Sequence, residues 1–72
     1  MDKYPINIKI KFGSEIVTLQ TTNDRVKTKT GVEIYMQQRQ SDWRPWAIIP
    51  DGTLEKHKHD KPKVIKVDWI EL

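Results

Sequence analysis

The chain has 72 residues, contains no cysteine and carries a formal net charge of +3. This length predicts one domain, residues 1–72, and a domain of this size buries only about 60 % of the surface that its unfolded chain exposes. Disulfides and thiolate zinc sites are excluded, so we expect an efficient β core or oligomerisation to supply stability. The N-terminus lacks a secretory signal pattern, and no segment approaches the roughly 20 apolar residues of a membrane span, so we expect a cytoplasmic protein.

The first predicted hairpin is centred on Gly13-Ser14. Residues 6–12 alternate apolar and polar side chains, which is typical of a half-buried strand. Glycine in the first position of a two-residue loop favours a type II′ turn. The expected core face of the first strand comprises Ile6, Ile8, Ile10 and Phe12. The expected register places Phe12 opposite Glu15, Ile10 opposite Val17 and Ile8 opposite Leu19.

Two more turns are predicted in the middle of the chain. Asn23-Asp24 suits a two-residue loop that would pair Thr21 with Val26. Lys29-Thr30-Gly31 suits a three-residue loop ending in a left-handed glycine, which would pair Val26 with Ile34. The core face is expected to continue through Val32, Ile34 and Met36.

The C-terminal half contains weaker signals. A turn of undefined length begins at Ser41, and residues 44–49 predict a strand in which Pro45 should occupy an edge or a strand start. Residues 53–63 suit either a poor strand or one turn of helix followed by a loop. Residues 64–72 predict a last strand with apolar side chains on both faces, which indicates burial on both sides or an edge that pairs with another strand.

These elements predict an all-β fold, an antiparallel meander of roughly five or six short strands. A small barrel of the SH3-like or OB-like type is the expected architecture, with the last strand closing onto the first. Closure of this kind would leave no exposed strand edges.

Catalytic and metal sites are not expected. Ser14 and Ser41 lie in predicted turns without a nucleophile-elbow pattern, and each glycine serves a turn rather than a phosphate-binding loop. His57 and His59 would share one face of a strand and could both reach one ion. Nearby positive charges oppose a cation there, namely Lys56, Lys58 and Lys61. We therefore predict a protein that is not an enzyme and has no cofactor and no metal.

The first functional hypothesis is a non-catalytic interaction protein. Small domains without cysteine or an active site often serve as adaptors, inhibitors or assembly parts, so we expect docking on a protein partner or on copies of the chain itself. Large exposed apolar side chains are the usual anchors of such contacts. The expected contact surface comprises Trp43, Trp46, Ile48, Trp69 and the last strand.

The alternative hypothesis is binding of nucleic acid or another polyanion. Cationic side chains beside exposed aromatic rings are typical of single-strand binders, in which cations contact phosphates and rings stack on bases. If the meander order holds, such side chains converge on the outward face of the sheet. The expected contacts are Lys9, Lys11, Lys27, Lys29, Tyr35, Arg39, Arg44 and Trp46. Outward positions of any sheet are polar, however, and an outward Ile16 equally suits a second buried face.

Overall fold

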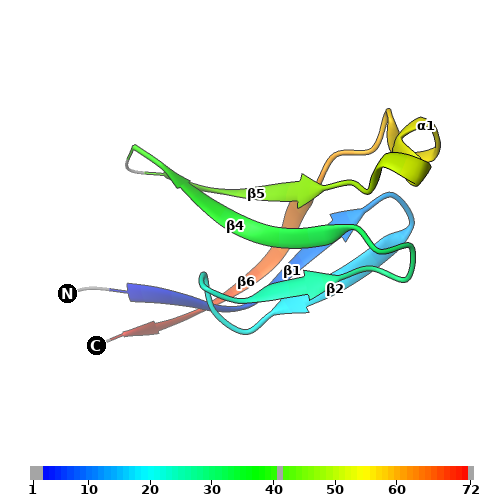
Figure 1. Ribbon diagram of the computed structural model, residues 1–72. Helices are drawn as coiled ribbons and strands as arrows, with labels where there is room; N and C mark the ends of the chain where they lie inside the picture. Colours follow the sequence, from blue (N-terminus) through cyan, green and yellow to red (C-terminus); the bar gives the residue numbers. More distant parts are fainter. Residues whose placement is uncertain (1–2, 41, 72) are drawn as a thin grey trace.

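The computed structural model describes residues 3–40 and 42–71, and most of them lie in strands. Two three-stranded antiparallel sheets are present, with strand orders β2-β1-β6 and β3-β4-β5. In Figure 1, β4 and β5 lie over β1 and β6, and β1 begins and β6 ends at the end of the molecule opposite the short helix α1 (Leu54–His57). The strands are β1 (Lys3–Phe12), β2 (Glu15–Leu19), β3 (Arg25–Lys27), β4 (Glu33–Arg39), β5 (Asp42–Ile48) and β6 (Lys63–Glu71).

The core lies between the two sheets. Its buried members from the first sheet are Ile8, Ile10, Phe12 and Leu19, and those from the chain leading into and along β4 are Val32 and Ile34. Partly buried residues from the remaining strands pack around them, including Val26, Met36, Ala47, Val64 and Val67. The predicted core face of β4 is therefore confirmed.

The predicted hairpin at Gly13 is confirmed. Gly13 has a φ of 61°, the left-handed region that the turn requires of its first residue. The observed register is the predicted one, with Phe12 opposite Glu15, Ile10 opposite Val17 and Ile8 opposite Leu19. Alternation and turn type agree at this hairpin, which is why the sequence determines its register.

The expected core position of Ile6 is wrong. An extra residue interrupts the β1–β6 ladder between Ile6 and Lys9, and Asn7 adopts a φ of 48° there. Asparagine tolerates this conformation better than most residues, so a bulge forms at Asn7. The side-chain alternation restarts after the bulge, which leaves Ile6 half-buried, opposite Asp68 and outside the core.

The predicted pairing of Thr21 with Val26 is also wrong. The chain does turn here, since the Asp24 N–H donates to the Thr21 carbonyl over 3.2 Å. The turn, however, carries the chain from β2 in the first sheet to β3 in the second. The last strand does pair with the first, as predicted, but within the described residues the ladders do not close into a barrel.

The second sheet follows the sequence more closely. Gly31 has a φ of 86°, and its N–H donates to the Thr28 carbonyl over 3.0 Å, so Val26 lies opposite Ile34 as predicted. β4 and β5 pair from Glu33 opposite Ile48 to Arg39 opposite Asp42. Pro45 lies within β5, which is an edge strand, where a residue without an N–H is tolerated.

The ambiguous stretch after β5 is helical rather than extended. A 3-10 turn, η1 (Asp51–Thr53), leads directly into the single-turn helix α1 (Leu54–His57). Among the described residues, no helix is long and apolar enough to cross a membrane.

Removal of one methylene from the core should lower stability measurably. Ile10 is fully buried, whereas Ile16 on the neighbouring strand is 57 % exposed. We expect Ile10→Val to lower the free energy of unfolding by about 0.5–1.5 kcal/mol. The matched control Ile16→Val should change it by less than about 0.5 kcal/mol. Urea unfolding followed by tryptophan fluorescence measures both; equal effects would contradict the assigned core.

Candidate functional site

The residues predicted to bind nucleic acid do not share one face, contrary to the expectation of a single converging surface. Lys9 and Lys11 alternate with buried residues of β1 and so lie on the outer face of the first sheet. Tyr35 and Trp46 lie on the outer face of the second sheet, opposite one another across β4 and β5. The two sheets pack with the core between them, so these faces point in opposite directions.

A row of three side chains crosses the outer face of the second sheet. Arg25 lies opposite Tyr35, and Tyr35 lies opposite Trp46, one residue from each strand. The Arg25 Cζ stands 4.7 Å from the centre of the Tyr35 ring, and its Nη1 is 2.7 Å from the Glu33 Oε1. Trp46 is 49 % exposed. We name Arg25, Tyr35 and Trp46 the aromatic row.

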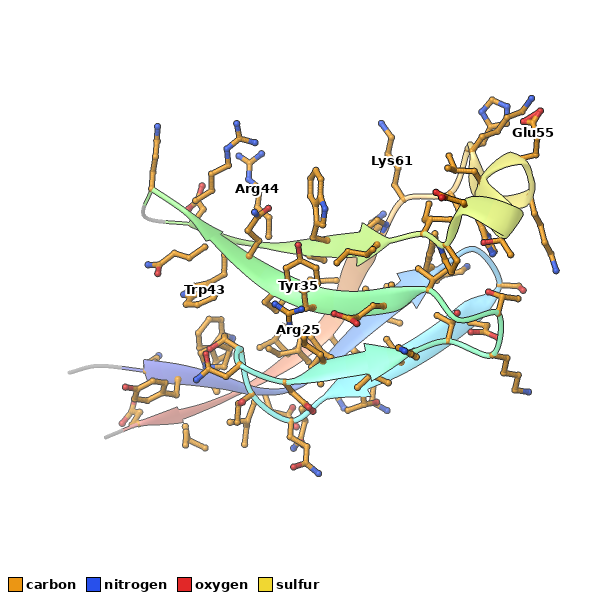
Figure 2. The ribbon with its side chains drawn as sticks, in the orientation of Figure 1. Arg25, Tyr35, Trp43, Arg44, Glu55 and Lys61 are labelled. Atoms are coloured by element: carbon orange, nitrogen blue, oxygen red, sulfur yellow. The ribbon has the colours of Figure 1, made fainter. Side chains whose placement is uncertain are left out.

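Further cations surround the aromatic row. Lys27 lies two residues after Arg25 on β3, and Arg44 lies two residues before Trp46 on β5. Because side chains alternate along a strand, both cations share the outer face with the row. Lys61 lines a shallow hollow together with Trp46. Figure 2 shows Arg44 and Lys61 projecting to the same side of β5, away from the first sheet. Arg39 lies at the end of β4. The nearby carboxylates are Glu33 and Asp42 on this face and Asp60 in the same hollow as Lys61, so cations outnumber them.

The outer face of the first sheet carries four lysines in two cross-strand pairs. Lys9 lies opposite Lys66, and Lys11 lies opposite Lys63. Among the described residues, none of the four forms an ion pair. Like charges in directly opposed positions are unfavourable. We name these four residues the lysine strip; on β2 they are flanked by Ile16 and Thr18.

Lys29, also predicted to contact phosphates, lies in the turn between β3 and β4, outside both faces. Its backbone N–H donates to the Glu15 carboxylate over 3.1 Å. This contact joins the β3–β4 turn to the first hairpin, so the Lys29 main chain has a structural role.

An apolar groove of about 480 Å³ opens between the sheets near the start of β1 and the end of β6. Trp43 and Trp69 both line it, and Figure 2 shows Trp43 pointing from β5 toward the first sheet. Trp46 and Ile48 lie instead on the outer face of β5. The residues predicted as one protein interface therefore occupy two surfaces. Other lining residues of the groove include Tyr4, Pro5, Met36, Val64 and Val67.

The opposite end of the sandwich is held by His57. Its ring lies 5.1 Å from that of Phe12, and its Nδ1 and Nε2 are 2.9 Å from the Asp60 Oδ2 and 3.1 Å from the Thr30 Oγ1. The order hydroxyl, imidazole and carboxylate resembles a catalytic triad. The Thr30 hydroxyl, however, also contacts the Thr28 hydroxyl at 3.1 Å within a tight turn. We assign the network to attachment of α1 onto β1 and the β3–β4 turn.

The possible shared metal site of His57 and His59 depended on a strand that does not form. His57 points inward with both ring nitrogens engaged, while His59 is exposed. Within residues 3–40 and 42–71, no group of three or more histidine, aspartate or glutamate side chains is arranged to hold a metal ion.

The chain matches no protein family model, no curated protein and no solved structure. Function is therefore inferred from the geometry of the aromatic row, the lysine strip and the groove. Arg25, Lys61, Lys63 and Lys66 belong to these surfaces but were not predicted. The outward alternation of Lys66 on the last strand was a usable signal, whereas Lys61 lies in a loop without periodicity.

Loss of the His57 side chain should destabilise the fold. His57→Ala removes two hydrogen bonds and the packing on Phe12, so we expect a decrease of about 1–3 kcal/mol in the free energy of unfolding. His59→Ala is the matched control, because His59 is exposed, and it should have little effect. Thermal or urea unfolding of both variants tests this; an unchanged midpoint for His57→Ala would rule out the structural role.

Proposed function

We propose that the protein binds single-stranded nucleic acid on the outer face of its second sheet. The observation that carries this proposal is the aromatic row, in which an exposed tryptophan and a tyrosine lie side by side on neighbouring strands with an arginine at one end. Unpaired bases stack on such rings, and nearby cations contact the phosphates that link them.

Trp46 is the principal stacking residue. Half of its surface is exposed, whereas one side of Tyr35 is occupied by Arg25. The ion pair between Arg25 and Glu33 holds the guanidinium over the tyrosine ring, which limits the freedom that both side chains lose when a ligand binds. Arginine also presents a planar group on which a base can stack. The row thus offers a platform of rings and guanidinium across three strands.

The surrounding cations supply the phosphate contacts. Lys27, Arg44 and Lys61 flank the row on different elements, and Lys27 and Lys61 form no ion pair within the described part of the chain. The ion pair of Arg44 with Asp42 is 4.0 Å long and largely solvent-exposed, so it contributes little. These positive charges are available to neutralise the phosphates of a nucleic-acid strand.

A single strand fits this face better than a duplex. In a duplex the bases are stacked on each other, so their faces are not accessible to protein rings. The lysine strip, which has Ile16 and Thr18 beside its charges, offers a polyanion electrostatic contacts without stacking. Stacking is therefore the contact that distinguishes the second sheet from the first.

Association with a protein is supported at a different surface. Trp43 and Trp69 line the groove, and β6 occupies an edge of the first sheet. Neither feature involves the aromatic row.

Removal of the Trp46 ring should weaken binding of single strands. We expect Trp46→Ala to lower the affinity for an oligothymidine about 5-fold to 100-fold, because stacking contributes roughly 1–3 kcal/mol for each base. Trp43→Ala is the matched control, since Trp43 is 41 % exposed but lines the groove instead of the outer face. Fluorescence anisotropy of a labelled oligonucleotide at low salt measures both. Absence of binding by the unaltered protein under these conditions would refute the proposal.

Neutralisation of charge should distinguish the two outer faces. We expect Lys27→Gln with Arg44→Gln to weaken binding and to reduce the slope of log affinity against log salt by about 1.4, or roughly 0.7 for each lost phosphate contact. Lys9→Gln with Lys11→Gln removes the same charge from the lysine strip and should leave the slope nearly unchanged. If the second pair has the larger effect, the lysine strip is the binding face.

A further inference from the structure

β6 presents an open edge along its whole length. It is the terminal strand of the first sheet and, within the described residues, pairs only with β1. Its exposed apolar side chains include Ile65 at 47 % and Trp69 at 59 %. An unprotected edge with apolar side chains is a template for pairing with another strand.

We propose that two copies of the chain associate by antiparallel pairing of their β6 strands around a two-fold axis at Val67. The sequence of β6, KVIKVDWIE, is complementary to itself in this register. Lys66 of each copy then lies opposite Asp68 of the other, and Ile65 lies opposite Trp69. Opposite charges and apolar side chains thus meet in directly opposed positions, which stabilises an antiparallel pair.

Neighbouring registers are disfavoured by charge or by geometry. A shift of the axis by one residue toward the C-terminus places Asp68 opposite Asp68, and a shift toward the N-terminus places Lys66 opposite Lys66. Like charges directly opposite each other are destabilising. An axis between two residues would pair side chains that point to different faces of the sheet, because alternation has a period of two. A shift of two residues places Lys66 opposite Val64 or Asp68 opposite Ile70, so the opposite-charge pairs are lost. The register centred on Val67 is therefore favoured over its neighbours.

The positions of these side chains in one copy agree with this register. Lys66 lies opposite Lys9, so its charge meets another cation within its own sheet. Asp68 lies opposite Ile6, with its Oδ2 3.3 Å from the Asn7 Nδ2. Both side chains occupy the outer face of the sheet, while Val67 between them packs on the core. The second copy supplies Lys66 with the carboxylate that its own chain does not place beside it.

Pairing would also cover the apolar groove at its open side. Val67 and Trp69 line the groove from β6, and paired residues share one face of a sheet. A second β6 therefore places its own Val67 opposite Val67 and its own Ile65 opposite Trp69, next to the same opening. The register shift between Lys9 and Ile10 leaves Ile65 as an extra residue in β6. The regular part of the pairing is therefore expected from Lys66 to Asp68, with Ile65 and Trp69 in contact at its ends.

Charge-swap variants test this assembly by sedimentation velocity and light scattering. The unaltered protein should be a dimer. Lys66→Glu and Asp68→Lys should each place like charges opposite one another at two positions, and each should raise the dimer Kd at least about tenfold. A mixture of the two variants should form heterodimers, because a carboxylate of one variant then lies opposite a lysine of the other at both positions. The double variant, Lys66→Glu with Asp68→Lys, should recover the homodimer.

Two controls exclude loss of folding as the cause. Lys66→Glu places a carboxylate opposite Lys9, which favours the fold of one copy, and circular dichroism should confirm this. Lys11→Glu makes the same charge change on the same face but away from the edge, and should leave the dimer intact. A monomer at all accessible concentrations, dimers that persist in both single variants, or failure of the mixture to associate would each overturn the proposal.

Discussion

The packing of Ile8, Ile10 and Phe12 against Val32 and Ile34 is the constraint on which the rest of the structure depends. These side chains come from the central strand of one sheet and from the segment that leads into and begins the central strand of the other. Their contact fixes which side of every strand faces inward, because side chains alternate along each strand. The lysine strip and the aromatic row therefore lie on opposite sides of the core. The groove lies between the sheets at the end where β1 begins and β6 ends.

Sequence patterns predicted the parts of the fold that depend on neighbouring residues. The Gly13 and Gly31 turns were predicted with their register, because a positive φ at glycine and the alternation of apolar residues determine both. The turn at Asn23-Asp24 was predicted, but its signal does not specify whether the next strand joins the same sheet. The bulge at Asn7 could not be predicted, because an asparagine at an outward position is equally compatible with a regular strand.

The candidate surfaces were predicted to a similar extent. Alternation along the fourth and fifth strands placed Tyr35, Arg44 and Trp46 correctly on an outer face. Lys9 and Lys11 were wrongly assigned to that face. Alternation along a strand does not show which sheet the strand joins, because sheet membership depends on contacts between residues far apart in the sequence. Arg25 was overlooked although the predicted register, with Val26 opposite Ile34, already places it opposite Tyr35.

Nucleic-acid binding and self-association use different sheets, so one does not obstruct the other. Pairing at β6 extends the first sheet sideways, while the aromatic row lies on the outer face of the second. A dimer would therefore carry two rows held in a fixed relation by one continuous six-stranded sheet of order β2-β1-β6-β6-β1-β2. A strand long enough to reach both rows would bind the second one at a high effective concentration, which raises affinity without any new contact. Dimerisation through the edge of β6 would then strengthen nucleic-acid binding at the aromatic row, although β6 itself does not contact the nucleic acid.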